Sequence, residues 1–397
     1  ADGQRRSLCD VDVGSTVLGY DITSGTFRPA LVLHHWFSGE KPVLQIRTQS
    51  GSILRCTREH RVLTFTGWRS AGDLHPGDRI ASPRSTPIEP WEFGRSDAAV
   101  KLLGYMIAEG ACTSGNHNFT NADSIIVQDF YRCAAAIGLT VKFVARYRHD
   151  LMGGAAGGVG WLKRMGLHGR GAHEKRLPGW VYGLPQRQKW LLLAAFFDTD
   201  GWVAFHGRLG ITLANRLLID DLRALLLQVG VPSSIWDKPN ACRGAWALVV
   251  DQDALQRCAD NMPLLLKGDK LHSILATDRY SLIDTYPAEV GRGLPHGVNR
   301  LLRRAGMRAG TPYTVTRGKL RRMIEAYPHP AWIGLESAHV FWDTVEDVHD
   351  AGLVETHDIE VGGCHSFVSN FLVTHNSTLA ELGAMVVGYF GLRRYGL

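Results

Sequence analysis

Paired cysteines are missing from this sequence. Its seven cysteines are scattered and odd in number, and no two of them form a C-x-x-C pair. Neither a zinc knuckle nor a disulfide framework is therefore supported. A chain without structural disulfides fits a reduced compartment, so we expect a cytoplasmic location.

Long apolar runs are also missing. No stretch approaches the roughly 20 residues that a membrane-spanning helix needs, and the opening ADGQRRSLCDV has no hydrophobic signal core. We therefore expect no membrane partner and no secretion. The sequence also lacks an initiator Met, from which we expect it to be a fragment.

The remaining composition is that of an ordinary folded protein, with 45% hydrophobic and 21% charged residues. Its 397 residues are enough for two or three domains. The net charge of +6, from 44 Lys+Arg against 38 Asp+Glu, suits a polyanionic partner. Many basic proteins bind no nucleic acid, however, so the charge alone decides nothing.

The pattern of the sequence changes twice. Residues 1 to about 95 contain short apolar or alternating runs separated by turn signals such as TSGT and SGEKP, which predict strands. Helical patterns dominate from Asp97, which we expect to cap the first helix, and the strand pattern returns near His357. This predicts a multidomain chain in which an all-β domain is split by an inserted α+β domain. The predicted ranges are 1–96, 97–345 and 346–376, followed by a separate segment, 377–397.

Two groups of reactive side chains lie in the β segments. Thr57 and His60 form a T-x-x-H motif at a strand end, in GSILRCTREHRVLT. The C-terminal stretch HDIEVGGCHSFVSNFLVTHNS carries five more residues: Asp358, His365, His375, Asn376 and Ser377. Either motif alone is common and usually structural. Together, at opposite ends of one interrupted β domain, they resemble an intein, a self-splicing element with a Hint-type fold.

The resemblance implies a catalytic role for each of these residues. A thiol or hydroxyl first attacks the preceding peptide carbonyl, while His60 protonates the leaving nitrogen and Thr57 orients the amide. Ser377 then accepts the acyl group. Asn376 attacks its own backbone carbonyl through its side-chain amide, which forms a succinimide and cuts the chain without any cofactor. The residues implied to assist or couple these steps are His375, His365 and Asp358.

The segment after Asn376 explains an unusual junction. STLAEL resembles the helix start that follows a phosphate-binding Gly-Lys-Ser-Thr loop, yet His375 and Asn376 stand where Gly-Lys belongs. Splicing would rejoin an upstream Gly-Lys to Ser377. Residues 377–397 are therefore expected to belong to a host that resembles a phosphate-loop ATPase, such as a replicative helicase or phage terminase. ATP would be bound by the host only, and the host segments are the expected partners in cis.

The first splicing nucleophile is expected upstream of residue 1. ADGQRRSLCDV resembles the hairpin that follows an intein's first block, so we interpret Cys9 as a small core residue. Cys364 is also interpreted as structural. Inteins that use a cysteine in this region carry it where this chain has Asp358, and they carry Trp where it has Val62.

The inserted segment contains a second pair of motifs. LLGYMIAEG and LAAFFDTDG are apolar helices that end in an acid before glycine, at Glu109 and Asp200. They resemble the paired LAGLIDADG motifs of homing endonucleases, whose two helices pack side by side. Small residues would permit that approach: Gly104, Ala108, Ala194 and Ala195. The resemblance implies that both carboxylates meet at one tip, bind Mg²⁺ and cut double-stranded DNA at the uninterrupted host-gene site. The enzyme is expected to be monomeric.

A basic stretch follows residue 290, and we expect it to contact DNA phosphates, with a solvated surface as the alternative. The residues assigned are Arg300, Arg303, Arg304, Arg317, Lys319, Arg321 and Arg322. The family often carries a lysine that assists the metal site after the second motif. Both Lys267 and Lys270 fit that position, and the sequence does not choose between them.

Two other classes of protein compete with the intein interpretation. A hedgehog-type autoprocessing domain would share the β fold and T-x-x-H but transfer the acyl group to another acceptor. The terminal His-Asn-Ser and the inserted domain argue against it. A DNA-binding protein or nuclease without splicing activity would leave His375, Asn376 and Ser377 unexplained.

Overall fold

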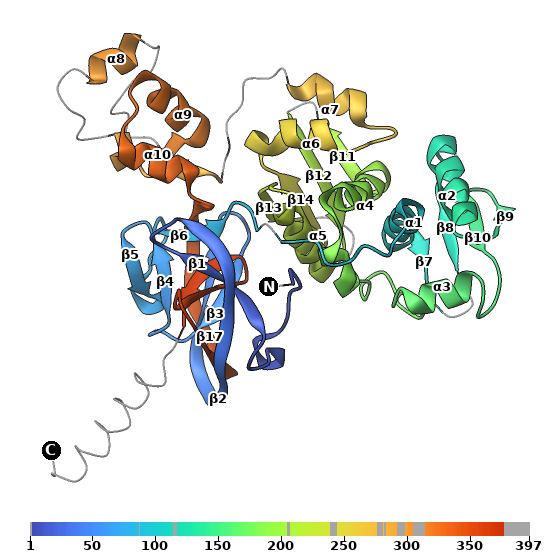
Figure 1. Ribbon diagram of the computed structural model, residues 1–397, viewed down its shortest axis with the longest axis horizontal. Helices are drawn as coiled ribbons and strands as arrows, with labels where there is room; N and C mark the ends of the chain where they lie inside the picture. The colour runs from blue at the N-terminus through green and yellow to red at the C-terminus, as the bar shows by residue number, and fades with distance from the viewer. Residues whose placement is uncertain are drawn as a thin grey trace. The chain divides into compact units, whose positions relative to one another are not determined.

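The chain folds into two compact units in the computed structural model (Figure 1). One unit holds Arg5–Arg84 and the described residues between Ile283 and Asn376, and the other holds the described residues of 85–282 with Asp2–Gln4. The structure describes residues 2–86, 88–113, 117–204, 207–238, 244–275, 281, 283–291, 298–304 and 314–376. An all-β domain interrupted by an α+β unit is the fold class that the sequence predicted.

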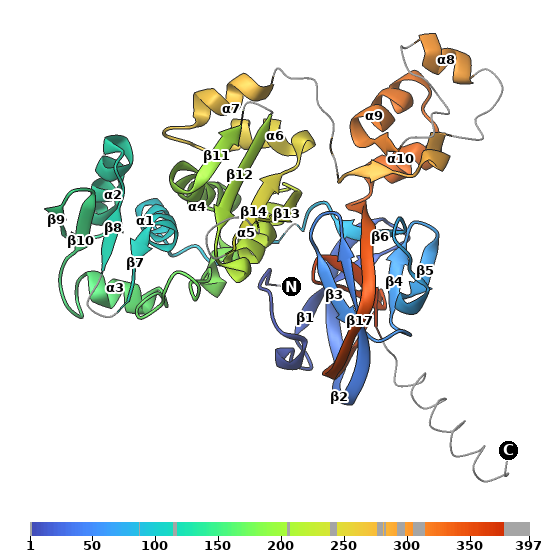
Figure 2. The ribbon, with the colours of Figure 1, turned by 180° about the vertical axis from the view of Figure 1, so that it is seen from behind.

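The first unit, the β unit, is built on a nine-stranded sheet. Its main path is β1-β2-β17-β6-β4-β19-β18, with β3 beside β2 and β5 beside β4. The strands are β1 Thr16–Asp21, β2 Thr26–Thr48, β3 Ile53–Cys56, β4 Arg61–Thr64, β5 Gly67–Ser70, β6 Arg79–Pro83, β17 Val340–Val361, β18 Ser366–Ser369 and β19 Leu372–His375, with 3-10 turns η1 Leu8–Asp10 and η2 Ala71–Asp73. The two longest strands, β2 and β17, come from opposite sides of the insertion and pair antiparallel (Figure 2).

Side-chain alternation explains how these strands form a core. In β2, Leu44, Ile46 and Thr48 are buried while Arg47 between them is exposed, as the two-residue period of a strand requires. Leu44 and Ile46 pack with Val62 of β4 and Leu372 of β19. The core therefore joins strands from both ends of the chain.

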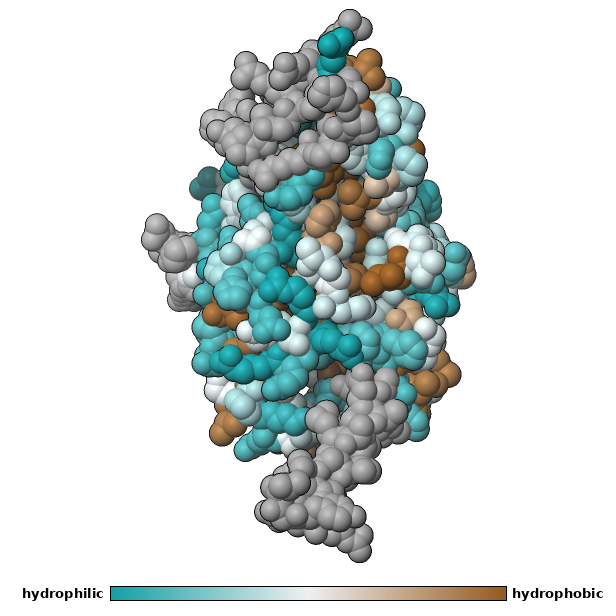
Figure 3. Space-filling view, turned by 90° about the vertical axis from the view of Figure 1, so that its left-hand side faces the viewer, coloured by the Kyte–Doolittle hydropathy of each residue, from teal (hydrophilic) through white to brown (hydrophobic). Residues whose placement is uncertain are grey.

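On the face shown in Figure 3, hydrophilic side chains predominate and hydrophobic ones gather in a few patches.

A small helical subdomain also belongs to the β unit. It contains β15 Thr285–Tyr286, η5 Ala288–Gly291, α8 Val298–Arg304, β16 Val315–Thr316, α9 Arg317–Ala326 and α10 Pro330–Ser337. Its own core includes Tyr286 and Trp332 and extends to Trp342 of β17. Arg84 at the end of β6 forms a buried ion pair with Asp284, with Nε and Oδ2 2.6 Å apart. Because of this packing, the residues from Ile283 group with the β unit, whereas the predicted insert ran to residue 345.

The second unit, the insert, contains the same arrangement twice. Each half has a helix, a strand pair, a second helix and a second strand pair, and the four strands take the equivalent orders β7-β8-β10-β9 and β11-β12-β14-β13. The first half comprises α1 Asp97–Ala108, β7 Gly110–Ala111, β8 Asn118–Thr120, α2 Ser124–Ala136, β9 Val141–Ala145 and β10 Arg148–Leu151. The second comprises α4 Gln186–Thr199, β11 Gly201–Ala204, β12 Arg208–Leu213, α5 Arg216–Gln228, β13 Ser233–Asp237 and β14 Trp246–Val250. The remaining elements are α3 Gly158–Arg164, η3 Gly179–Gly183, η4 Gln252–Ala254, α6 Leu255–Asn261 and α7 Gly268–Leu275.

The first motif helix begins one residue earlier than the sequence indicated. Ser96, not Asp97, is the N-cap of α1, and its side chain accepts a hydrogen bond from the amide of Ala99. Asp97 is the first helical residue and pairs with Arg187 of α4, which ties the starts of the two motif helices together.

No helix in the described part of the chain combines the length and apolar character that crossing a bilayer requires.

Candidate functional sites

The last hairpin of the β unit places His375 and Asn376 at its open end. Strands β18 and β19 pair with Ser366 opposite His375. A two-residue turn joins them, with Asn370 and Phe371 at φ values of 46° and 68°, as a tight hairpin turn requires. On the other side β19 pairs with β4, the strand that follows the T-x-x-H turn. Two predicted groups that are distant in sequence thus lie on adjacent strands.

Asn376 is held firmly at this end of the hairpin. It is only 2% exposed. Its backbone amide donates to the carbonyl of His365 at 3.1 Å, and its side-chain Nδ2 donates to the carbonyl of Val361 at 3.2 Å. Its Oδ1 is buried and has no hydrogen-bond partner among the described residues, which is uncommon for a buried polar atom. These contacts restrict the side-chain amide that the predicted cyclisation uses as its nucleophile.

His375 contacts the carbonyl that this nucleophile would attack. Its Nδ1 lies 2.6 Å from the backbone oxygen of Asn376 and, as an N–H, donates to it. Its ring meets the Trp68 ring at 88°, with 4.9 Å between centroids. A donor aimed at a carbonyl oxygen stabilises the negative charge that develops there during attack.

The imidazole of His60 is close enough to Asp358 and His375 for their charges to affect its pKa. The backbone amide of His60 donates to the carbonyl of Thr57 at 3.2 Å, which closes the T-x-x-H turn. The His60 side chain is partly exposed, but burial of its imidazole among neighbouring atoms lowers the pKa of that group to about 4. The charge of Asp358 opposes this shift, and the charge of His375 adds to it. His60 is therefore neutral at pH 7. Asp358 accepts a hydrogen bond from the hydroxyl of Ser38 at 2.6 Å, a partner that sequence reasoning missed.

Four other residues from the sequence analysis have separate outcomes. His365 supplies its backbone carbonyl to Asn376, while its own side chain is exposed and its φ is 50°. Cys9 is exposed in η1, so its interpretation as a core residue is wrong. Cys364 is partly buried and packs against the cluster around Val32, as a structural cysteine does. Ser377 lies outside the described residues.

In the insert, α1 and α4 pack at a point of close approach between small residues. A Cβ added to Gly104 would lie 2.7 Å from the Cβ of Ala195 and 3.1 Å from the carbonyl oxygen of Leu192. Glu109 and Asp200 are the C-cap residues of these two helices. The packing therefore brings the two acids toward one end of the helix pair.

Both carboxylates are partly buried, and each environment penalises ionisation. Burial raises the pKa of Glu109, the hydrogen bond from Asn121 at 2.5 Å opposes the rise, and the charge of Asp200 adds to it. Burial also raises the pKa of Asp200, while Lys175 and Lys267 oppose the rise. One oxygen of Asp200, Oδ2, is buried without a hydrogen-bond partner among the described residues. Two carboxylates with an unsatisfied buried oxygen fit a divalent cation that keeps water or phosphate as further ligands. No cluster of three or more His, Cys, Asp or Glu side chains that could hold a metal by themselves occurs in the described ranges.

Two lysines cap the motif helices in the same way. Lys267 Nζ donates to the carbonyls of Phe197, Asp198 and Thr199 at 2.7, 2.6 and 3.3 Å. Lys175 Nζ does the same at the end of α1, where it donates to the carbonyls of Met106, Ile107 and Gly110. Each cation satisfies backbone acceptors that a helix end leaves unpaired.

The structure thus favours Lys267 over the exposed Lys270, which the sequence left open. It also adds Lys175, which sequence reasoning missed. Lys175 follows the first half of the internal repeat, as Lys267 follows the second. Aligning the two halves of the insert against each other would have found it.

The predicted phosphate-binding residues fall into three groups. Arg317 and Arg321 both pair with Glu336, at 2.9 and 2.8 Å, so their charge is partly neutralised. Arg300 and Arg322 are exposed and Lys319 is partly exposed. The side chains of Arg303 and Arg304 lie outside the part that the structure describes.

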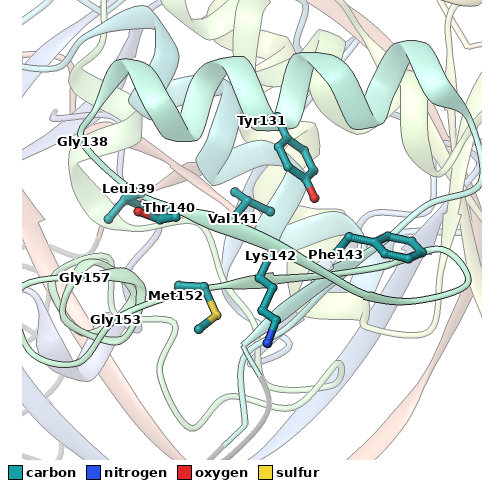
Figure 4. Close-up of a pocket in the computed structure, with 10 residues that line it drawn as sticks. All are labelled: Tyr131, Gly138, Leu139, Thr140, Val141, Lys142, Phe143, Met152, Gly153 and Gly157. Carbon is teal, nitrogen blue, oxygen red and sulfur yellow. The ribbon is translucent and has the colours of Figure 1, made fainter.

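A separate cavity of about 780 Å³ lies in the first half of the insert, between α2, β9 and the loop before α3. Tyr131, Phe143 and Met152 are among its lining residues, and their side chains come from these different elements (Figure 4). None of the predicted site residues lines it. The cavity therefore belongs to neither candidate site.

Comparison with known proteins places these observations in a family. The model of the "Intein splicing domain" matches residues 3–376. The replicative DNA helicase DnaB of Rhodothermus marinus is 24% identical over the whole chain, which spans 46% of that relative, so the chain covers about half of its length.

Similar solved structures include a mutant of the Ssp DnaB mini-intein, 10% identical, which covers 94% of this chain and 90% of its own with a TM-score of 0.31. Mesophilic variants of the homing endonuclease I-DmoI are 16% identical over 45% of this chain and 97% of theirs, with a TM-score of 0.33.

Proposed function

The chain belongs to the family of intein splicing domains, and on this premise we propose that the site around Asn376 performs the C-terminal cleavage of protein splicing. The Nδ2 atom of Asn376 attacks its own backbone carbonyl carbon and closes a succinimide ring. The bond to Ser377 then breaks, and the departing nitrogen takes up a proton to become a free amino group. The observation that carries the proposal is the 2.6 Å contact from His375 Nδ1 to the Asn376 carbonyl oxygen.

The neighbouring residues divide the other roles. His60, neutral at pH 7, is available to exchange a proton at the N-terminal junction, and Thr57 orients the amide there. Asp358, which influences the pKa of His60, couples the two ends, and Ser377 receives the acyl group. These roles use the host segments as partners in cis and need no cofactor.

Mass spectrometry of the purified chain tests the cleavage. Release of the peptide Ser377–Leu397 is expected, and Asn376→Ala should abolish it because alanine has no side-chain amide. Asn261→Ala is a matched control, since Asn261 is exposed on α6 of the insert. Continued release from Asn376→Ala would sink the assignment.

For the insert we propose site-specific cleavage of double-stranded DNA at the uninterrupted host-gene site. Glu109 and Asp200 would hold a divalent cation such as Mg²⁺, which supplies Lewis-acid stabilisation of a scissile phosphate. The close helix contact at Gly104, the unsatisfied oxygen of Asp200 and the flanking lysines support this role.

The basic residues support DNA binding to different degrees. Arg300, Lys319 and Arg322 are the best candidates for phosphate contacts, because Arg317 and Arg321 already pair with Glu336. The two ion pairs with Glu336 therefore favour the other three residues for this role. Glu109→Gln should abolish plasmid cleavage but retain salt-sensitive DNA binding; undiminished cleavage would refute the site.

We further propose that the host is a phosphate-loop ATPase of the replicative helicase kind, located in the cytoplasm. The likeness to the DnaB helicase of Rhodothermus marinus supports it, as does the STLAEL sequence after Asn376. ATP would bind to the host alone, and the intein itself would act as a monomer. Sequencing the host gene upstream tests this, since Gly-Lys should precede the first intein residue.

A further inference from the structure

Strand β19 carries His375, but the strand alone does not fix the plane of the imidazole ring beside the scissile carbonyl. The outer torsion of a histidine side chain is broad, so the ring tilts out of any one plane at little cost in an open environment. Only one orientation places Nδ1 at 2.6 Å from the Asn376 oxygen. Something beyond the strand has to select that orientation.

Trp68 is in the position to select it. Its indole meets the His375 ring nearly perpendicularly, at 88° and 4.9 Å between centroids, which is a favoured geometry for aromatic pairs. An imidazole tilted out of this plane would lose the contact. The Trp68 ring therefore stabilises this plane of the His375 ring over tilted ones.

The indole is itself well anchored. Trp68 lies on β5, where it pairs with Leu63 of β4. Its side chain packs against the buried cluster that includes Leu63 and Val373. Since β4 also pairs with β19 at Thr374, the strands that carry Trp68 and His375 are linked through β4.

We infer that Trp68 is a positioning residue for the cyclisation of Asn376, holding the His375 ring so that Nδ1–H donates to the scissile carbonyl oxygen. The inference rests on the proposed cleavage. Trp68 touches no reacting atom in the described contacts and acts through His375 alone. It needs an aromatic ring at position 68 and no hydrogen bond from the indole nitrogen.

The ring requirement gives a test by conservative rescue. Trp68→Leu should slow release of the C-terminal peptide about tenfold or more, as loss of orientation does, while Trp68→Phe should keep most of the parental rate. Phe65→Leu is the matched control, because Phe65 forms the same kind of perpendicular pair with Trp342 in this unit. It should release the peptide at the parental rate. If the leucine variant does not fold, Trp68→Met replaces it.

A spectroscopic measurement separates positioning from a general loss of stability. In an Asn376→Ala background, which keeps the chain intact, histidine labelled with ¹⁵N should show a protected Nδ1–H of His375. The signal should persist in Trp68→Phe and disappear in Trp68→Leu. Parental cleavage by Trp68→Leu, or an unchanged Nδ1–H signal in it, would overturn the inference. Absence of cleavage in the parent itself would instead overturn the proposed function.

Discussion

Gly104 of α1 lies so close to Ala195 of α4 that a Cβ atom on the glycine would come within 2.7 Å of the alanine Cβ. Real Cβ atoms do not approach this closely, so the contact requires glycine. It sets the distance between the two motif helices. The position of Glu109 relative to Asp200 depends on that distance.

Gly104→Val should therefore destabilise the insert by about 1–3 kcal/mol through overpacking and reduce DNA cleavage. Urea unfolding followed by the helical circular dichroism signal measures the loss. Gly154→Ala is the control, because a Cβ at Gly154 would meet nothing within 4 Å. Equal losses in the two variants would contradict the packing role.

Asp200→Asn should make the insert more stable in EDTA while abolishing DNA cleavage. Burial disfavours the ionised Asp200 carboxylate, and its Oδ2 has no partner in the described residues; removing the charge relieves this cost. Added Mg²⁺ should raise the unfolding midpoint of the parent but not of the variant. The midpoints are measured with and without Mg²⁺, and a variant that responds to Mg²⁺ like the parent would count against this site.

Lys267→Met should lower DNA cleavage at least about tenfold, since it removes the cation that caps α4 and lies near both acids. Lys270→Met should leave cleavage near the parental rate because Lys270 is exposed. Plasmid cleavage under matched salt decides between them. The reverse pattern would move the supporting role to Lys270.

The β unit should lose stability as the pH falls from about 6.5 to about 4. Because burial lowers the pKa of folded His60 to about 4, the unfolded chain binds a proton in this range that the folded chain does not. The difference amounts to at most about 3 kcal/mol. Denaturation at pH 7.5 and pH 4.5 measures it, and His60→Gln should show a smaller drop. An equal drop in the variant would show that other groups cause the acid sensitivity.

The chemistry of the splicing site was largely accessible from sequence, because it depends on residues that are neighbours in the chain. His375 lies next to Asn376, and a single turn separates Thr57 from His60. The contacts that orient these groups were not accessible. Ser38 and Trp68 reach the site through strand pairings between distant segments, and no local pattern determines which strands pair.

The surroundings of single side chains were not accessible from sequence for a similar reason. Cys9 looked like a core residue from composition, but the short turn η1 leaves it exposed, and residue type alone does not set exposure. Arg317 and Arg321 were assigned to DNA phosphates from their charge, and this assignment stays a prediction, but the tertiary fold places Glu336 beside both. A run of basic residues therefore predicts a DNA-binding surface only when the acidic residues that pair with it in the fold are known.

The buried pair between Arg84 and Asp284 means that the chain leaves the β unit and returns to it at one place. For the β unit, residues 85–282 are one large loop whose two ends are held together by this pair. Such a loop could be gained, shortened or lost during evolution without disturbing the strands around Asn376. A short flexible bridge in place of residues 85–282 should therefore leave a smaller protein that still releases its C-terminal peptide.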